Sequence, residues 1–258
     1  MSQASVPNGS GKEPGFSAPQ YAAVWAVHAY TALGFVAGFL ALRATVNGQA
    51  RSAFGWLAVA VLIDATDGTL ARAARVKQLA PWFDGSKLDD LVDYLTFVFV
   101  PAVFVYHFQL MPASTSLLFA GLMLMASGYG FCQAEAKTAD FFFTGFPSYW
   151  NIVVFYLYAA HTPAWLNAGV VGLCVVLVFV PIRYVYPSRT VPLRRLSNGL
   201  GVVWAALVVV LIWQLPAPHP WLLGGSLFYP VYYVAVSVYL HVTLPPGPTA
   251  GQTASSPR

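Results

Sequence analysis

Six of the nine acidic residues of this 258-residue chain lie in one short stretch: Asp64, Asp67, Asp84, Asp89, Asp90 and Asp93. Asp64 and Asp67 are three positions apart and Asp89 and Asp93 are four apart, so each pair shares one face of a helix. Four converging carboxylates cannot all stay ionised unless positive charge lies between them. Divalent ions such as Mg²⁺ or Mn²⁺ supply that charge and prefer oxygen ligands. The spacing predicts a site for two divalent metal ions, a type of site that catalyses phosphoryl displacement.

Small residues and one arginine continue the carboxylate face. Gly68 follows Asp64 by one turn, and Ala71 follows Asp67 by one turn, which leaves bare backbone where a flat group such as a nucleotide could lie. Arg72 comes next, and a guanidinium binds phosphate through two parallel hydrogen bonds. This pattern favours a phosphate-containing ligand beside the metal ions.

The elements that carry these residues are expected to span a membrane. The chain is 58% hydrophobic and only 9% charged, whereas a soluble domain has about 25% charged residues. Apolar runs of about 20 residues recur, which is the length that crosses a bilayer as a helix. The sequence predicts an all-α integral membrane protein with eight transmembrane helices, at about 21–45, 52–72, 89–111, 114–134, 147–161, 165–186, 198–215 and 221–241.

The termini and the charges complete this topology. Residues 1–20 and 243–258 are polar, Gly- and Pro-rich tails that we expect to be disordered, which leaves 21–242 as the membrane domain. Pro147 is expected in the first turn of the fifth helix. With both termini in the cytoplasm, every Lys and Arg except Arg43 and Arg51 is cytoplasmic, as the positive-inside rule requires. The two aspartate pairs then lie on facing helix ends at the cytoplasmic surface.

The stretch DATDGTLAR followed by GSKLDDLVD resembles the signature of the CDP-alcohol phosphotransferase family, DxxDGxxAR followed by GxxxDxxxD. All the fixed positions match: Asp64, Asp67, Gly68, Ala71, Arg72, Gly85, Asp89 and Asp93. Twelve residues separate Arg72 from Gly85. This spacer is longer than in the commoner form of the signature, and together with the eight-helix layout it resembles the bacterial phosphatidylcholine synthase branch.

The resemblance implies a role for each motif residue. Asp64, Asp67 and Asp89 would hold the two metal ions, and Asp93 would contact a metal and act as the general base on an acceptor hydroxyl. The pocket for the cytidine diphosphate part would be formed by Asp64, Gly68, Ala71, Arg72 and Gly85. The implied substrates are CDP-diacylglycerol and choline, with release of CMP. The resemblance further implies a homodimer in the bacterial inner membrane, with its site facing the cytoplasm and no nucleic-acid partner.

Choline is a quaternary ammonium, which proteins bind with aromatic faces and carboxylates. The candidates at the cytoplasmic end are Glu135, Tyr149, Trp150, Asn151, Tyr184 and Tyr186. Candidates for the lipid phosphate are Lys137, Arg189, Arg194 and Arg195. Aromatic residues at a membrane surface also serve as anchors, and basic ones set the topology, so both sets have a second interpretation. The histidines His28 and His241 are expected to be hydrogen-bonded core residues.

Three alternatives stay open. Another acceptor, such as serine, glycerol phosphate or inositol phosphate, fits the same signature, and Lys137 with the nearby arginines would suit an anionic one. A membrane prenyltransferase also binds diphosphate through paired aspartates, but its motifs are farther apart and lack DGxxAR. A divalent-cation transporter needs polar residues at several depths, whereas the acids here gather at one end of the predicted bundle.

Overall fold

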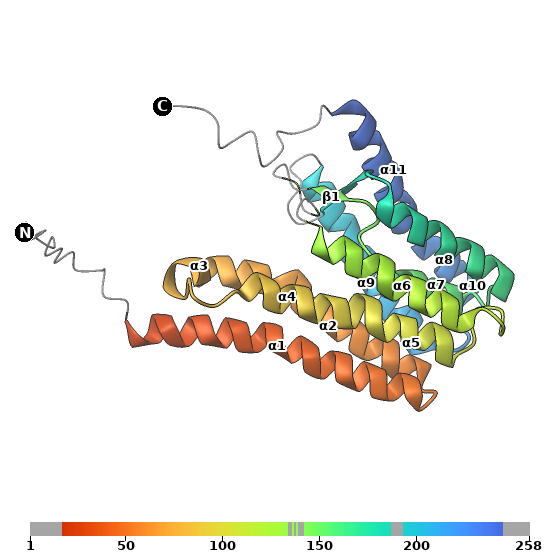
Figure 1. The fold of residues 1–258 in the computed structure, drawn as a ribbon, viewed down its shortest axis with the longest axis horizontal. Coiled ribbons are helices and arrows are strands. Elements are labelled where there is room, and N and C mark those ends of the chain that lie inside the picture. Colours follow the sequence, from red (N-terminus) through yellow and green to blue (C-terminus); the bar gives the residue numbers. More distant parts are fainter. Residues whose placement is uncertain (1–16, 134–135, 137, 139–141, 187–192, 245–258) are drawn as a thin grey trace, which may run out of the picture.

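The computed structural model describes residues 17–133, 136, 138, 142–186 and 193–244, which form a bundle of helices with one small sheet (Figure 1). The elements are α1 (Ala18–Val46), α2 (Ala50–Ala73), α3 (Val76–Leu79), α4 (Gly85–Asp93), the π-helical segment η1 (Tyr94–Phe99), α5 (Val100–His107), α6 (Ser116–Cys132), β1 (Phe142–Thr144), α7 (Trp150–Ala159), α8 (Ala164–Phe179), β2 (Arg183–Val185), α9 (Arg194–Gln214), α10 (Pro220–Ser226) and α11 (Phe228–Thr243). The segment from α4 through η1 to α5 is one continuous helical rod beside α1 and α2.

The described residues include four helical stretches long and apolar enough to cross a membrane. They are α1, α2, α9 and the α10–α11 pair, while α6, α7 and α8 are shorter apolar helices. Large apolar side chains face outward, among them Leu117 at 72% exposure and Trp213 at 78%. A soluble protein rarely exposes so much contiguous apolar surface. The structure therefore agrees with the predicted helical membrane protein.

Connections that the sequence predicts on the outer side of the membrane meet at one end of the bundle. Arg51, in the α1–α2 region, donates from Nε to the carbonyl of Leu215, 3.1 Å away, after α9. His161, between α7 and α8, has its Nε2 2.9 Å from the carbonyl of Pro216. The carboxyl end of α2 and the start of α4, which carry the aspartates, lie at the other end of the bundle (Figure 1). We call it the carboxylate end. This arrangement is the one expected of a chain that alternates between two membrane surfaces.

The sixth predicted helix is wrong at its carboxyl end. The helix was expected to continue to residue 186, but α8 ends at Phe179 and Val180 is extended with ψ 121°. Val180 precedes Pro181, and a residue before proline is driven out of the α region. The chain then forms β2, which pairs antiparallel with β1. Tyr184 and Tyr186 therefore lie on and after a strand.

The fifth predicted helix is wrong at its amino end. Pro147 was expected in its first turn, but α7 begins only at Trp150. Ser148 interrupts the chain between them with a left-handed φ of 56°. The short connection ends in Tyr149, which occupies the N-cap position of α7. This turn directs Tyr149 toward the carboxylate end.

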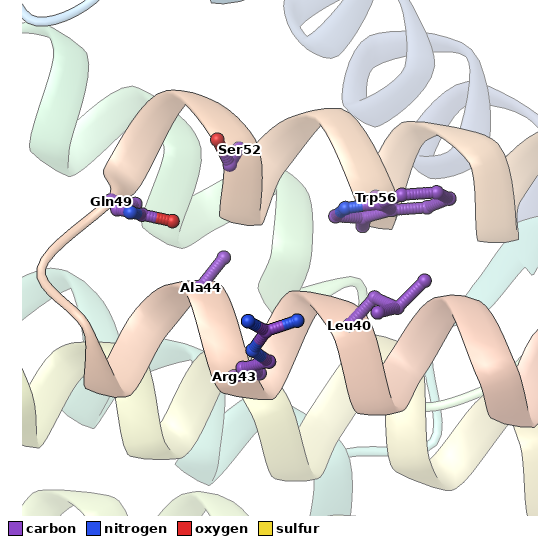
Figure 2. Close-up of a pocket in the computed structure, with 6 residues that line it drawn as sticks. All are labelled: Leu40, Arg43, Ala44, Gln49, Ser52 and Trp56. Carbon is purple, nitrogen blue, oxygen red and sulfur yellow. The ribbon is translucent and has the colours of Figure 1, made fainter.

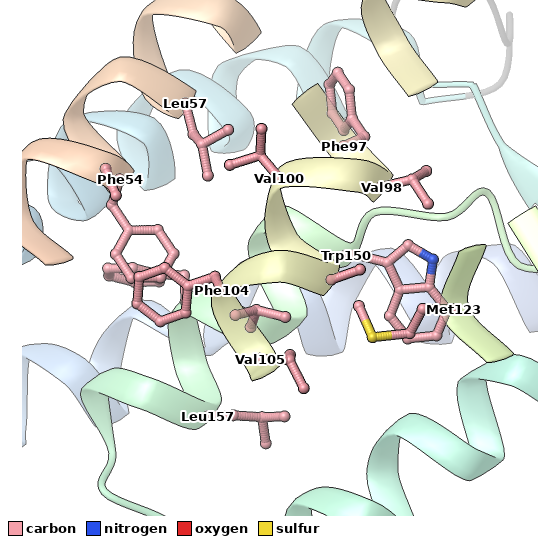
Figure 3. Close-up of a cluster of buried hydrophobic side chains, with 14 of the residues drawn as sticks. Phe54, Leu57, Phe97, Val98, Val100, Phe104, Val105, Met123, Trp150 and Leu157 are labelled. Carbon is pink, nitrogen blue, oxygen red and sulfur yellow. The ribbon is translucent and has the colours of Figure 1, made fainter. Parts of the chain in front are cut away.

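The hydrophobic core holds the start of α7 in place. Phe54 from α2, Phe104 from α5 and Trp150 from α7 are buried in one cluster, together with Met123 from α6 (Figure 3). The Trp150 indole donates to Ser127 Oγ at 2.7 Å. A buried indole N–H needs such a partner. Packing and this hydrogen bond fix the residue next to Tyr149.

Helix α11 anchors the small sheet. The backbone N–H of Val185 donates to Ser237 Oγ at 3.1 Å, and the hydroxyl of Tyr233 donates to the Val185 carbonyl at 3.0 Å. Both bonds join β2 to the same face of α11. The sheet and α11 therefore form one unit at the carboxylate end.

Replacing Arg183 by alanine is expected to loosen this unit. The guanidinium of Arg183 donates to the carbonyls of His241 and Leu244 at the carboxyl end of α11, and His241 Nδ1 accepts from the Arg183 backbone at 3.3 Å. Hydrogen bonds from a charged donor contribute about 1.5–3 kcal/mol. Thermal unfolding in detergent should show Arg183→Ala with a Tm several degrees below that of the parent. Arg194→Ala, at an exposed position of α9, is the control; an equal Tm for both variants would exclude this capping role.

Candidate active site

Two antiparallel helix ends bring three carboxylates together. The Asp84 side chain accepts from the backbone N–H of Lys87 at 3.0 Å and so caps the start of α4. Because α4 starts there, Asp89 and Asp93 lie one turn apart on the face toward α2. One carboxylate oxygen each from Asp64, Asp89 and Asp93 lies within 4.8 Å of the other two. We call these three residues the acidic triad; all three are half-buried.

Asp67 lies against α1, not in the acidic triad. It is buried, and its Oδ2 accepts from the hydroxyl of Thr31 at 2.9 Å. One residue earlier on each helix, the hydroxyls of Tyr30 and Thr66 are 2.8 Å apart. The sequence predicted the aspartate but not its partner. Helix α1 is therefore part of the site.

Two glycines allow α1 to approach the α4–η1 rod. A Cβ on Gly34 would lie 2.3 Å from Cγ1 of Val92, and a Cβ on Gly38 would lie 2.7 Å from Cδ2 of Leu95. Close contact of this kind is typical of small residues between membrane helices. It holds α1 where Thr31 reaches Asp67.

The residues predicted around the phosphates lie at the end of α2 and the start of α4. Arg72 is exposed, and its Nη2 donates to Thr69 Oγ1 at 2.8 Å. Gly68 is half-exposed on the same side of α2, since a Cβ there would lie 3.4 Å from Arg72 Nη1. Ala71 packs against a small buried cluster with α1. Arg72 and Gly68 thus present a positively charged surface one to two turns beyond Asp64.

Aromatic rings gather at the carboxylate end. Ring centroids of Tyr149 and Tyr233 are 6.1 Å apart, and those of Tyr184 and Tyr233 are 6.3 Å apart. Phe143 lies 4.7 Å from Tyr186 and 6.4 Å from Tyr149, again between centroids. We call these five residues the aromatic cluster. Aromatic faces in this number are suited to a cation.

The aromatic cluster adjoins the acidic triad through Tyr149. Burial holds the pKa of the Tyr149 phenol well above its usual value, and the negative charges of Asp64 and, more weakly, Asp93 raise it further. The phenol therefore stays protonated at neutral pH and remains a hydrogen-bond donor. The ring centroid of Phe97, one turn after Asp93, lies 5.9 Å from that of Tyr149, so this ring is on the Asp93 side of the site. A cation held by the cluster would also be attracted by the triad.

Sequence reasoning missed two members of the aromatic cluster. Tyr233 is in α11 and Phe143 is in β1, and tyrosines and phenylalanines are common in both regions without distinctive spacing. Their contact with Tyr149 depends on the β1–β2 sheet docking on α11. No periodic signal in the sequence predicts that docking.

The remaining residues predicted to contact choline or the lipid phosphate lie in the core, at the surface or outside the described residues. Asn151 is buried, and its Oδ1 accepts from the Ile152 backbone N–H at 2.9 Å. Arg194 and Arg195 are exposed at the start of α9. Glu135, Lys137 and Arg189 lie outside the described residues. The structure thus brings Tyr149, Tyr184 and Tyr186 together, while Trp150 and Asn151 support them from the core.

A groove at the opposite end of the bundle is separate from this site. It lies between α1 and α2 near their connection (Figure 2) and is lined by Leu40, Arg43, Ala44, Gln49, Ser52 and Trp56. Trp56, the groove residue nearest to Asp64 along α2, is still about two helical turns away from it. The groove takes no part in the chemistry of the triad.

The acidic triad has the chemistry of a hard-cation site. Its three oxygens are close enough to share an ion, and carboxylates are the ligands that Mg²⁺ and Mn²⁺ prefer. Without a cation, three carboxylates this close would repel one another and favour proton uptake. The residues present therefore fit a divalent metal ion.

Comparison with known proteins finds several relatives that share one name. The chain is 38% identical over 218 residues to the phosphatidylcholine synthase of Pseudomonas aeruginosa, which covers 84% of this chain and 92% of that protein. The chain belongs to the phosphatidylcholine synthase family. It is also 34% identical over 219 residues to the phosphatidylcholine synthase of Rhizobium meliloti, and 42% identical over 178 residues to that of Legionella pneumophila. Those matches cover 84% and 69% of this chain, and 88% and 70% of the relatives.

Membership of the phosphatidylcholine synthase family extends well beyond the aspartate motif. The aligned 218 residues of the Pseudomonas relative are far longer than the segment from Asp64 to Asp93. They must include most of the apolar helices as well. No protein-family profile matches the chain.

Proposed function

We propose that this protein is a phosphatidylcholine synthase that transfers the phosphatidyl group of CDP-diacylglycerol to choline and releases CMP. The observation that carries the proposal is the acidic triad beside the aromatic cluster, in a chain of the phosphatidylcholine synthase family. A triad alone would suit many metal-dependent reactions. The adjoining aromatic rings add a place for a quaternary ammonium.

We assign the protein to the wider CDP-alcohol phosphotransferase family. All the fixed signature positions from Asp64 to Asp93 support this assignment. Asp64, Asp89 and Asp93 converge as the signature requires, and Asp67 is held beside them by Thr31. A prenyltransferase or a cation transporter accounts less well for the same residues, because neither needs an aromatic cluster beside the acids.

Two divalent ions, Mn²⁺ or Mg²⁺, are proposed as cofactors, held by Asp64, Asp67, Asp89 and Asp93. When bound, such ions neutralise the diphosphate and make CMP a better leaving group. Arg72 lies two turns beyond Asp64 along α2, and its guanidinium is proposed to bind a phosphate. Gly68, Ala71 and Gly85 are proposed to complete the pocket for the cytidine diphosphate part with Asp64 and Arg72.

Asp93 is proposed to take the proton of the choline hydroxyl. The choline oxygen then forms a bond with the lipid-linked phosphorus, while the bond from that phosphorus to the CMP oxygen breaks. Asp93 comes directly before η1 and has a buried Oδ1, so the proton acceptor is shielded from bulk water. Holding both substrates in line is the main contribution that the protein makes to such a reaction.

The aromatic cluster is the proposed choline site. Tyr149 contacts Tyr233 and also Phe97, which is one turn after Asp93, and a trimethylammonium group held there is proposed to direct its hydroxyl toward Asp93. Tyr184 and Tyr186 are the proposed choline contacts on the β2 side. The predicted contacts of choline with Glu135, Trp150 and Asn151 stay predictions. Among acceptors, only a cation benefits from both the rings and the acids. Choline is therefore favoured over serine, glycerol phosphate and inositol phosphate.

The membrane placement follows from the same set of features. We propose eight spans over residues 21–242, polar tails at 1–20 and 243–258, both termini in the cytoplasm and the site facing the cytoplasmic side of a bacterial inner membrane. Lys137, Arg189, Arg194 and Arg195 are proposed contacts for the lipid phosphate. A homodimer is expected from the family resemblance.

Incorporation of labelled choline tests the function. Purified protein in detergent with CDP-diacylglycerol and Mn²⁺ should form labelled lipid and an equal amount of CMP, and a chelator should abolish both. Unlabelled choline should compete fully, whereas serine, glycerol phosphate and inositol phosphate should not. Release of CMP with one of those alcohols but not with choline would show a different acceptor. No CMP release with any alcohol would refute the enzymatic proposal, and metal flux into proteoliposomes would then test transport.

A further inference from the structure

His28 has a buried nitrogen without a partner. The side chain is only 6% exposed on α1, and among the residues that the structure describes its Nε2 has no hydrogen-bond partner. The sequence predicted a hydrogen-bonded core histidine, and for Nε2 this prediction is wrong. A buried polar atom without a hydrogen-bond partner destabilises the folded protein. Such a cost is tolerated where a ligand supplies the missing partner.

Two aromatic rings pack against His28, but neither forms a hydrogen bond with its Nε2. The centroid of Phe83 lies 4.3 Å from that of the imidazole, and the centroid of Trp25 lies 5.7 Å away. Neither contact gives Nε2 a conventional acceptor. These rings fix the orientation of the imidazole.

Gly85 leaves room for the imidazole. A Cβ on Gly85 would lie 2.8 Å from Cε1 of His28 and 3.3 Å from Nδ1. The Nδ1–Cε1 edge of the ring therefore faces the start of α4, and Nε2 lies farther from Gly85. The signature glycine at this position therefore has a structural reason within the protein itself.

The long spacer between Arg72 and Gly85 covers α1 beside His28. Arg75 turns the chain with a left-handed φ of 53°, and α3 follows at once. Val76 and Leu79 of this spacer are buried against Val24 of α1. The spacer ends at Phe83 and Asp84, which places the Phe83 ring on His28. A shorter connection would have fewer residues to cover this side of α1.

His28 lies near the carboxylates, on the side where α2 ends. His28 precedes Thr31 by three residues, about 4.5 Å along α1, and Thr31 holds Asp67. Gly85 precedes Asp89 by four residues, about 6 Å along α4. Both measures place the imidazole one turn beyond the carboxylates, toward the end where α2 finishes. The aromatic cluster is on other elements, α7, α11 and the sheet.

We propose that His28 Nε2 forms a hydrogen bond with the nucleotide part of the lipid donor, and that Gly85 and the spacer hold the imidazole for this contact. The inference rests on the proposed function. A nucleoside diphosphate bound through its phosphates at the triad extends several ångströms past it, and its sugar and base offer many hydrogen-bonding groups. The acyl chains of the donor require an apolar surface, and choline has a single hydroxyl that must reach the phosphorus.

Two variants of equal length test the contact. His28→Gln retains a polar group near the position of Nε2, whereas His28→Met has a similar shape without one. Binding of labelled CMP in the presence of Mn²⁺, the KM for CDP-diacylglycerol and the KM for choline are measured for both. His28→Met should weaken CMP binding and raise the donor KM about tenfold, the effect of one lost hydrogen bond. His28→Gln should lose less, and the choline KM should stay within about twofold in both.

Each departure from this result has a distinct meaning. Unchanged CMP binding in His28→Met, or a raised choline KM alone, would overturn the assignment to the nucleotide. If the parent protein binds CMP through His28 but incorporates no choline, the inference stands and the proposed acceptor fails. If the parent protein binds no CMP at all, both are refuted.

The close contact with Gly85 gives a second test. Gly85→Ala should lower the Tm, because the added methyl group would press on the imidazole. Adding His28→Ala should recover the Tm, since it removes the clashing ring, but should leave CMP binding weak. A Gly85→Ala protein with an unchanged Tm would show that the glycine does not serve to accommodate His28, and would remove this part of the proposal.

Discussion

Replacing Asp93 by asparagine is expected to lower the rate of choline incorporation by about 10³-fold or more. The change removes the proposed proton acceptor, and general base catalysis alone contributes about 10²–10⁴-fold. It also removes one of the three charges of the acidic triad, whose oxygens lie within 4.8 Å of one another. Asparagine has nearly the same shape, so the loss should appear in turnover at saturating substrates and not in folding.

Neighbouring aspartates provide matched controls for this variant. Asp90 is adjacent in α4 but does not belong to the acidic triad, so Asp90→Asn should keep most of the activity. Asp89→Asn should lose activity that is partly recovered at higher Mn²⁺ concentrations, because it removes a metal ligand and not the base. Asp93→Asn should not recover in this way. If Asp93→Asn retained half the parent rate, another group would have to be the base.

Local spacing predicted four converging carboxylates, and three of them form the acidic triad. Asp64, Asp89 and Asp93 were predicted to converge because short-range helix geometry decides which residues share a face, and because a short link makes neighbouring helices antiparallel. The structure confirms that they can hold a cation together. Asp67 differs, since its partner Thr31 is 36 positions away on α1. A single threonine in an apolar helix gives no sign of such a contact.

The aromatic cluster depends on contacts between residues far apart in the sequence and on two very short strands. Strands of three residues, such as β1 and β2, have no periodic pattern that distinguishes them from loops. Pro181 was a usable signal for the end of α8, but the apolar run around it favoured a longer helix. The position of Tyr186 next to Phe143 follows from that early helix end. The sequence therefore predicted Tyr149, Tyr184 and Tyr186 at the carboxylate end, but neither Tyr233 nor the sheet and α11 that hold them.

Truncating Tyr149 to alanine is expected to raise the KM for choline about 30-fold. A desolvated cation over an aromatic face gains about 2 kcal/mol, which corresponds to that factor. Tyr149 is the ring that joins the aromatic cluster to the side of the acidic triad, since its centroid is 6.1 Å from that of Tyr233 and 5.9 Å from that of Phe97, one turn after Asp93. Tyr149→Phe keeps the aromatic face, so its choline KM should stay within a few-fold of the parent value.

The matched control is Tyr156, a tyrosine within α7 that has other hydrogen-bond partners. The hydroxyl of Tyr156 lies 2.9 Å from Ser226 Oγ and accepts from the Trp204 indole at 2.9 Å. Tyr156→Phe should therefore lower the Tm without changing the choline KM. Ethanolamine adds a second comparison, because it lacks the three methyl groups that contact aromatic faces. Tyr149→Ala should reduce the preference for choline over ethanolamine, while a rise in the KM for CDP-diacylglycerol alone would place Tyr149 on the donor side and require a different cation site.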